Sequence, residues 1–456
     1  MHEEKVEKIL KEALARIKPS KEEIEKETGQ VDEIVRRLER IVPRDVEIRV
    51  VGSLVHGTNL RGSSDIDVFL LFDKKKGKKE ITKEGLNYAK KIIGKGDDYE
   101  IKYAEHPYLR AYLYSLGVEA DIVPAYKIEN IEEMATAVDR SPLHTEFVLS
   151  HLSEKEKDEV RLLKFFLKNH SLYGAEVYTG GFSGYLCELL VYQFGSFYSV
   201  LKFFAEAKLP IVVEPKSKEL NKNIELVKKF GSKFVVVDPV DPDRNVAAPV
   251  SMESLARFTL LARSFIAKPS KSLFYGKGFS REEAISGLNA FLRTAGFHVF
   301  VMVTKLPKKS EDITWPQLRK TAEIIKEFAS TYSYNFELTI PVVFEDKGIM
   351  LFVSRELQSK SRIMKGPSVF MKTASDLFLK RHKKAIATFL KDDILFAIEP
   401  NRFKSAEELL RFVARGGLRN RRKDVMLKGA KLYVDKVPED YVDIVYGELR
   451  KKFLNL

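Results

Sequence analysis

VGSLVHGTNLRGSSDIDVFLLF, residues 51–72, is the stretch that decides the fold. The apolar run that ends at Val51 and the run from Val68 to Phe72 predict two strands. Between them, the Gly52-Ser53 pair opens a short turn whose backbone N–H groups are able to face an anion. The sequence therefore predicts a strand, a phosphate-facing turn and a second strand in that order.

A pair of aspartates, Asp65 and Asp67, begins the second of these strands. Alternate residues of a strand point to the same face, so the two carboxylates project together while Ile66, Val68 and Leu70 turn to the opposite face. Two carboxylates at this spacing repel each other unless a divalent cation lies between them. Hard oxygen ligands suit Mg²⁺, with Mn²⁺ as a second candidate. Taken alone, an Asp-x-Asp is more often a solvated strand end.

A third carboxylate changes that balance. In VEADIVP, residues 118–124, Asp121 shares a face with Glu119 and Val123, and a proline ends the strand. A half-buried aspartate in such a place needs a partner, because an unpaired carboxylate there is costly. A metal shared with Asp65 and Asp67 supplies that partner, so the sequence predicts one metal site built from three aspartates.

These motifs resemble the nucleotidyltransferase core of the DNA polymerase beta superfamily. More narrowly, the chain resembles archaeal-type (class I) CCA-adding enzymes, which are tRNA nucleotidyltransferases. The similarity covers about the first 270 residues and is weaker beyond them. Further matching motifs are YAEHPY (103–108), AVDRSP (137–142), RLLK (161–164), YGAE (173–176), GFSGYLCE (181–188) and DPDRNVAA (241–248). The family commonly has Glu-x-Asp where this chain has Asp65 and Asp67, a conservative departure.

The resemblance implies template-independent addition of CCA to the 3′ end of tRNA from CTP and ATP, with release of pyrophosphate. It makes Asp65, Asp67 and Asp121 the metal ligands and catalytic residues, with Asp121 the expected activator of the terminal ribose hydroxyl. A poly(A)-polymerase-like 3′-terminal nucleotidyltransferase is the alternative within this class. A catalytically silent RNA-binding homologue is the alternative outside it, although such a protein has no reason to keep three clustered like charges.

The resemblance also assigns a nucleotide-binding set. Its members are Ser53, His56, His144, Lys164, Tyr173 and Arg244. His56 falls where the family typically has an arginine on the phosphates, and an imidazole is only partly charged at neutral pH and has no planar fork. Arg244 matches the arginine that reads the incoming base together with the RNA backbone, and its donor fork suits cytosine or adenine. A salt bridge to Asp241 or Asp243 is the alternative role for Arg244. Without the resemblance, Lys164 would be predicted on the surface and Tyr173 in the core.

Composition is consistent with this assignment. The chain has 456 residues, 44% of them hydrophobic and 31% charged, which predicts a soluble protein of several domains. No apolar run reaches membrane-spanning length and the start of the chain is charged, so we expect a cytoplasmic protein without a membrane partner. The single cysteine, Cys187, excludes an internal disulfide and is predicted to pack in the core.

A net charge of +13 favours a polyanionic partner, although a solvated lysine- and glutamate-rich surface is the other interpretation. Residues 401–456 contain fourteen lysines or arginines against eight aspartates or glutamates. Arginine beside glycine approaches a phosphate backbone closely, so we expect tRNA contacts near Gly416 and Gly417, with a solvated helix–turn as the alternative. The expected RNA-binding residues are Arg415, Arg419, Arg421 and Arg422.

The pattern along the chain predicts an α+β multidomain fold. We expect a polymerase-beta-like nucleotidyltransferase head over residues 1–145 and a mainly helical central domain for nucleotide and base recognition over 146–268. Residues 269–456 are expected to form an α+β C-terminal body and tail that bind tRNA, the tail resembling a ferredoxin-like domain. A homodimer is expected because dimers are usual in the family. The chain has no Gly-x4-Gly-Lys-Ser/Thr loop and no Gly-x-Gly-x-x-Gly after a strand, which disfavours a P-loop ATPase and a dinucleotide oxidoreductase.

Overall fold

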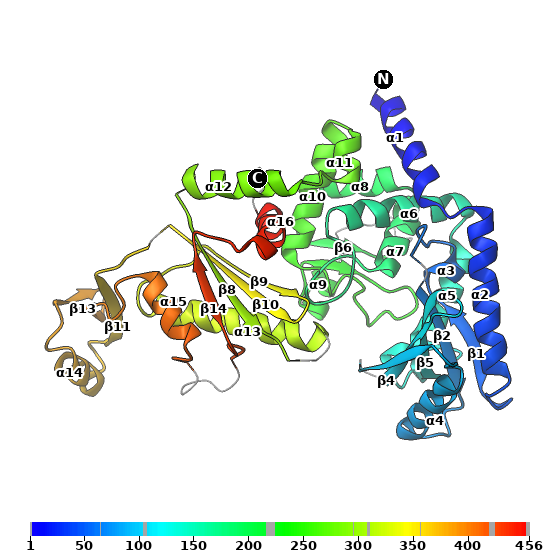
Figure 1. The fold of residues 1–456 in the computed structure, drawn as a ribbon, viewed down its shortest axis with the longest axis horizontal. Coiled ribbons are helices and arrows are strands. Elements are labelled where there is room, and N and C mark those ends of the chain that lie inside the picture. The colour runs from blue at the N-terminus through cyan, green and yellow to red at the C-terminus, as the bar shows by residue number, and fades with distance from the viewer. Residues whose placement is uncertain are drawn as a thin grey trace. The chain divides into compact units, whose positions relative to one another are not determined.

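The structure is a computed structural model. It describes residues 2–63, 65–103, 107–215, 224–294, 296–307, 311–355, 357–418 and 425–452. The chain divides into two compact units, Met1–Lys277 and Gly278–Leu456, and most of their helices and strands are labelled in Figure 1.

The first unit contains a five-stranded mixed sheet in the order β1-β2-β5-β4-β3. Strands β2 and β5 pair in parallel, and the other neighbours pair antiparallel. Because β2 carries the Asp-x-Asp pair and β5 carries the third aspartate, the parallel pairing places the two parts of the motif side by side. The strands are β1 (Glu47–Val51), β2 (Asp65–Phe72), β3 (Asp98–Tyr103), β4 (Pro107–Leu113) and β5 (Val118–Tyr126).

Helices α2 (Lys21–Glu39) and α4 (Lys78–Lys91) supply the core beneath this sheet (Figure 1). Ile66, Val68 and Leu70 of β2 are almost completely buried in that core. A register shift of one residue would place the carboxylates there instead, so burial of the apolar side chains fixes which face the aspartates occupy. The predicted alternation along β2 is confirmed.

A helical core follows the sheet along the chain. It also includes the apolar face of α1 (His2–Ile17), whose Val6, Ile9 and Ala13 are buried among the later helices. The remaining helices are α3 (Ser53–His56), α5 (Ser141–His151), α6 (Glu154–Asn169), α7 (Gly184–Phe194), α8 (Phe197–Glu206), α9 (Ile224–Phe230), α10 (Met252–Ala267) and α11 (Lys271–Tyr275). Two short 3₁₀ helices span Ile131–Glu133 and Ala137–Arg140, and strands β6 (Ile211–Val213) and β7 (Phe234–Val236) pair in parallel.

The second unit is built on a four-stranded antiparallel sheet in the order β14-β8-β10-β9. Its inner strands bury side chains on both faces, in one core shared with α13 and α15 and in another shared with α12 and α16. The elements of this layer are α12 (Arg281–Thr294), β8 (His298–Lys305), α13 (Glu311–Ser330), β9 (Leu338–Phe344), β10 (Lys347–Ser354), α15 (Ala406–Ala414), β14 (Lys431–Val434) and α16 (Val442–Lys452). A 3₁₀ helix covers Glu439–Tyr441.

A smaller sheet in the order β11-β13-β12 is inserted between β10 and α15 along the chain. It consists of β11 (Ser361–Ser368), β12 (Ala387–Lys391) and β13 (Ile394–Pro400), with α14 (Lys372–Arg381) beside β11.

The predicted core position of Cys187 is confirmed. Cys187 is fully buried, and the aromatic residues of α6 to α8 pack in or against the helical core rather than forming a base-stacking platform. Ser251 caps α10 by accepting a hydrogen bond from the backbone N–H of Ser254. Helix α13 begins at Glu311 and has Pro316 inside it.

Candidate active site

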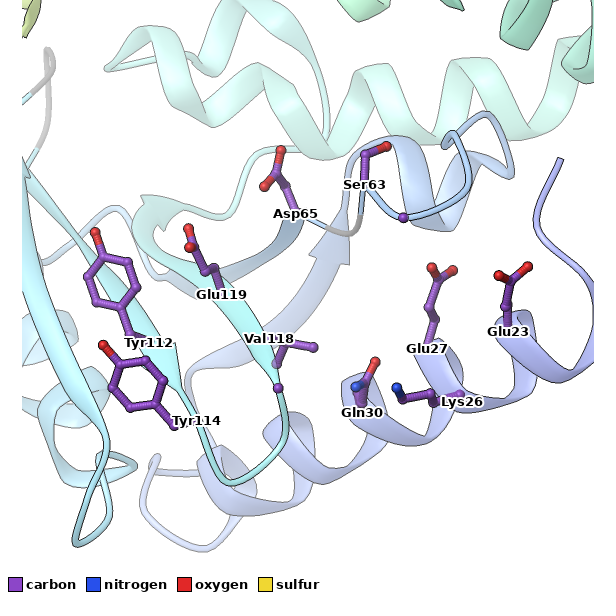
Figure 2. Close-up of a pocket in the computed structure, with 12 residues that line it drawn as sticks. Glu23, Lys26, Glu27, Gln30, Ser63, Asp65, Tyr112, Tyr114, Val118 and Glu119 are labelled. Atoms are coloured by element: carbon purple, nitrogen blue, oxygen red, sulfur yellow. The ribbon is translucent and has the colours of Figure 1, made fainter. Parts of the chain in front are cut away.

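The sheet brings the three predicted aspartates to one face. Asp67 lies directly opposite Asp121 in the β2–β5 register, and Asp65 lies opposite Glu119. Figure 2 shows Asp65 and Glu119 on adjacent strands with their carboxylates raised to the same side. The face thus presents a row of carboxylates where β2 begins.

Asp67 is the most strongly perturbed member of this row. Burial raises its pKa to about 7, and the negative charges of Asp121 and Asp65 add to the effect. Such a shift means that an ionised Asp67 is poorly compensated by the protein alone. A divalent cation would relieve both the burial and the repulsion, so the donor chemistry fits a hard metal ion.

Arg110 supplies the counter-charge to Asp121. It lies opposite Asp121 on β4, and its Nε and Nη2 donate to the two carboxylate oxygens at 2.7 and 2.6 Å. Among the residues that the structure describes, no group of three or more histidine, cysteine, aspartate or glutamate side chains is gathered tightly enough to hold a metal. The residues therefore fit a cation by charge and by strand placement, with Asp121 engaged by Arg110 in this arrangement.

Gly52 makes the approach to Asp67 possible. It has a φ of +89°, and a Cβ at this position would lie 2.6 Å from Oδ2 of Asp67. Ser53, the predicted triphosphate contact, follows as the first residue of α3. The glycine therefore permits both the left-handed turn and the contact of backbone with carboxylate.

Gly52→Ala is expected to lower the rate of nucleotide incorporation roughly tenfold or more and to destabilise the fold by about 1–3 kcal/mol. The added methyl group would collide with Asp67, and alanine is strained at a positive φ. Gly96→Ala is the matched control, since Gly96 has a φ of +97° with no atom near its Cβ position. Steady-state rates and urea unfolding are measured for both variants. The comparison separates the effect of the contact with Asp67 from the effect of backbone strain at a positive φ. An equal loss of activity in the two variants would show that the contact with Asp67 is unimportant.

The raised pKa of Asp67 predicts that the free energy of unfolding depends on pH when a chelator keeps the site free of metal. The folded-state pKa of about 7 exceeds the ordinary value of 3.8, so folding takes up a proton between these values. The free energy of unfolding therefore falls as the pH rises from about 4 to about 7, by roughly 2–4 kcal/mol from this group. Urea unfolding with EDTA should show Asp67→Asn gaining stability over the parent across this window. Parallel pH profiles for the two proteins would contradict the assignment.

A groove of about 560 Å³ opens beside Asp65 (Figure 2). Glu23 and Glu27 of α2 face Asp65 and Glu119 across it, so the lining is strongly acidic. A triphosphate is disfavoured against such a wall without counter-ions. The basic groups predicted for nucleotide binding lie elsewhere, around a buried glutamate.

Glu188 of α7 is that glutamate, and sequence reasoning did not assign it a role. Its Oε1 lies 3.1 Å from Nδ1 of His56 and accepts hydrogen bonds from Oγ1 of Thr58 at 2.6 Å and Nζ of Lys164 at 3.2 Å. Burial alone would raise the pKa of the Glu188 carboxyl, but Lys164, His56 and Thr58 together lower it to about 2. Lys164 is only 2% exposed, so the surface position that the local sequence pattern alone would predict for it is wrong. The second nitrogen of His56 contacts Oγ1 of Thr145 at 2.9 Å.

Tyr173 is close enough to Glu188 of this cluster and to Asp65 for both charges to act on its hydroxyl. Burial raises the pKa of its hydroxyl, and Cys187, Glu188 and Asp65 raise it further. A Cβ on Gly184 would lie 3.1 Å from the Tyr173 hydroxyl and 3.4 Å from Nζ of Lys164. The first residue of α7 thus borders both side chains.

Asp238, after β7, is the centre of a second cluster that sequence reasoning missed. It is fully buried, and its Oδ2 contacts Nε2 of His144 at 2.8 Å and Nη1 of Arg244 at 2.9 Å. Its Oδ1 accepts from the Tyr185 hydroxyl at 3.0 Å. The rings of His144 and Tyr185 stack with their centroids 4.1 Å apart. Burial lowers the pKa of His144 despite Asp238, which favours a neutral ring.

The alternative role predicted for Arg244, a salt bridge to Asp241 or Asp243, was wrong because Arg244 pairs with a different aspartate. Asp241 pairs with Arg140 at 2.5 Å and Asp243 pairs with Lys229 at 2.5 Å, whereas Arg244 pairs with Asp238.

Helices α5 and α7 join the two clusters. Neighbouring residues of α5 divide between them, since His144 contacts Asp238 and Thr145 contacts His56. Residues three apart on α7 do the same, since Tyr185 contacts Asp238 and Glu188 contacts Lys164. Four of the six predicted nucleotide-binding residues, His56, Lys164, His144 and Arg244, are therefore held in two linked clusters.

The predicted RNA-binding arginines lie in the second unit. Arg415 follows α15 and lines a depression with Arg402, Arg411 and Phe412. Arg419, Arg421 and Arg422 lie outside the described residues.

Three family models match successive parts of the chain. A nucleotidyltransferase domain matches residues 31–153, the second domain of tRNA nucleotidyltransferases matches 158–275, and the C-terminal domain of CCA-adding enzymes matches 295–420. Within the described residues, no helix is long and apolar enough to cross a membrane.

Curated relatives match over nearly the whole length. The CCA-adding enzyme of Pyrococcus abyssi is 36% identical over 97% of this chain and 98% of its own. That of Methanocaldococcus jannaschii is 36% identical over 91% of this chain and 92% of its own. A crystal structure of the Cid1 poly(U) polymerase covers 59% of this chain and 98% of its own with a TM-score of 0.50 and 18% identity, a likeness of fold alone.

Proposed function

The chain belongs to the family of archaeal CCA-adding enzymes, and from that membership we propose how its own residues carry out the reaction. The function is template-independent addition of CCA to the 3′ end of tRNA from CTP and ATP, by nucleotidyl transfer with release of pyrophosphate. The observation that carries the catalytic assignment is the register of β2 and β5, which sets Asp67 opposite Asp121 on the face that also carries Asp65.

Nucleotidyltransferases of this kind use divalent metal ions, and we assign Mg²⁺ to this site. Asp65, Asp67 and Asp121 would hold it. When bound, it supplies a Lewis acid that lowers the pKa of the terminal ribose hydroxyl and offsets the charge at the α-phosphate. Asp121, on the neighbouring strand, is assigned to the hydroxyl because the family resemblance implies that role, and Arg110 supplies its counter-charge in this arrangement.

Most of the proposed nucleotide-binding residues belong to the two buried clusters. Ser53 and Lys164 are assigned to the triphosphate, and Tyr173 is assigned to the same nucleotide site. His56 acts on the same region through Glu188, which both His56 and Lys164 contact. His144 and Arg244 are assigned to the base, where Arg244 offers donors only and so suits the acceptor atoms of cytosine and adenine.

We also propose a role for each of the three parts of the chain. We assign residues 1–145 to catalysis, 146–268 to nucleotide and base recognition, and 269–456 to tRNA binding through basic residues such as Arg415. A net charge of +13 supports a polyanionic partner. We further propose a homodimer that works in the cytoplasm.

The deciding experiment incubates the purified protein with tRNA lacking its 3′ CCA and with labelled CTP or ATP. Incorporation of two C residues followed by one A supports the proposal. Long homopolymer tails would favour a poly(A)-polymerase-like enzyme, and binding without incorporation would favour a silent RNA-binding homologue.

A further inference from the structure

A buried carboxylate stands behind the residues assigned to the base. Asp238 has no exposed surface, whereas the side chain of Arg244 is 32% exposed. Asp238 therefore holds Arg244 from the buried side, while about a third of the Arg244 side chain stays exposed. The geometry of that outer part depends on how firmly Asp238 itself is held.

Asp238 cannot turn without breaking contacts on both of its oxygens. Oδ1 accepts from the backbone N–H of Val240 at 3.0 Å and from the Tyr185 hydroxyl at 3.0 Å. Oδ2 contacts Arg244 and His144. One oxygen thus anchors the carboxylate to its own loop and to α7, and the other orients Arg244 and His144, the two side chains assigned above to the base.

The backbone of this loop is fixed as well. The N–H of Asp238 donates to the carbonyl of Arg244 at 3.1 Å, and the N–H of Arg244 donates to the carbonyl of Asp241 at 2.9 Å. The side-chain oxygen of Asn245 accepts from the backbone N–H groups of Val236 and Ala247. Neither the main chain nor the inner nitrogen of Arg244 is therefore free to adapt to a different base.

A guanidinium group held in one position can distinguish a base whose ring nitrogen accepts a hydrogen bond from a base whose ring nitrogen carries a hydrogen. On their pairing edges, cytosine N3 and adenine N1 are acceptors, whereas uracil N3 and guanine N1 carry a hydrogen. Arginine has donors only, so an N–H aimed at a ring nitrogen pairs with the first two bases and opposes the last two. A side chain free to swing could avoid this opposition, and selectivity would fall.

We infer that Asp238 is a specificity-determining positioning residue, which locks Arg244 and His144 so that CTP and ATP are selected over UTP and GTP. Asp238 does not touch the nucleotide itself. The inference rests on the proposed function, because it assumes that Arg244 faces the incoming base.

The test compares Asp238→Asn with the parent in single-nucleotide incorporation. kcat/KM is measured for CTP and UTP on tRNA lacking CCA, and for ATP and GTP on tRNA ending in CC. The ratios of CTP to UTP and of ATP to GTP should fall roughly tenfold or more, because the amide loses the charge and one acceptor. Asp243→Asn is the matched control: it neutralises an exposed aspartate in the same loop, paired with Lys229, and should leave both ratios unchanged.

Tyr185→Phe covers the case in which Asp238→Asn does not fold. It removes only the hydroxyl bond to Oδ1 and keeps the ring that stacks on His144, so a smaller fall in the same ratios is expected. A uniform loss of rate with all four nucleotides and unchanged ratios in the folded variants would overturn the inference. Failure of the parent protein to incorporate CTP would instead overturn the proposed function.

Discussion

Asp67→Ala is expected to lower incorporation of CTP and ATP by roughly 10³-fold or more, because it removes a ligand from the centre of the acidic row. Asp121→Ala should have an effect of the same order, since Asp121 lies opposite Asp67 in the strand register. Both rates are measured with saturating nucleotide and tRNA lacking its 3′ end, in single-turnover format so that product release does not hide the loss.

Binding of tRNA should survive both changes. Each substitution removes a negative charge, which cannot weaken attraction to a polyanion, and neither residue belongs to the basic set of the second unit. Titration of labelled tRNA should therefore give a Kd within about threefold of the parent value.

Asp73→Ala is the matched control for these two variants. Asp73 follows the last residue of β2, is exposed, and accepts a hydrogen bond from the backbone N–H of Lys75 at 2.8 Å. Its loss removes an aspartate from the far end of the same strand without touching the acidic row. Full activity in either Asp67→Ala or Asp121→Ala would refute the catalytic assignment of the sheet face.

The part of this site that local patterns predict is the part set by strand geometry. Alternation along β2 placed Asp65 and Asp67 on one face because Ile66 and Val68 must be buried. The run around Asp121 ended in a proline as a strand should. Both signals lie within a few residues of chain, where a period of two fixes side-chain direction.

The charge partners were beyond such reasoning because they are distant in sequence. His56 and Glu188 are 132 residues apart, and His144 and Asp238 are 94 apart. One local signal for Glu188 did exist, since it is the only charged residue in the apolar helix GYLCELLVYQF. A lone carboxylate in such a run is seldom fully buried unless it is paired.

Lys164 shows the same dependence on distant partners, because the local pattern alone would predict it on the surface. Its neighbours on α6 include Arg161 and Lys168, and three basic residues along one helix usually face solvent. Arg161 and Lys164 are instead buried, because Arg161 donates to the carbonyl of Asn59 and to Asp158 and Lys164 reaches Glu188. Tertiary partners on other elements decided the outcome.

Glu188→Ala is expected to destabilise the protein by about 3–5 kcal/mol, because it leaves the buried ammonium of Lys164 without its counter-charge. The lowered pKa of Glu188 has a further consequence for pH. The folded-state value of about 2 lies below the ordinary 4.5, so the contribution of Glu188 is fully present above about pH 4.5 and is lost as the pH falls toward 2. Urea unfolding at pH 7 and near pH 3 should therefore show a smaller difference between variant and parent at the lower pH.

Glu154→Ala tests whether burial, rather than pairing itself, sets the size of this effect. Glu154 also pairs with a lysine, Lys157 at 2.6 Å, but its side chain is 83% exposed, so a cost of less than about 1 kcal/mol is expected. Removing both buried partners in Lys164→Met with Glu188→Gln should restore part of the stability lost in Glu188→Ala, since no unpaired charge remains. Equal costs for Glu188→Ala and Glu154→Ala would mean that the buried carboxylate is not the counter-charge that holds Lys164 in place.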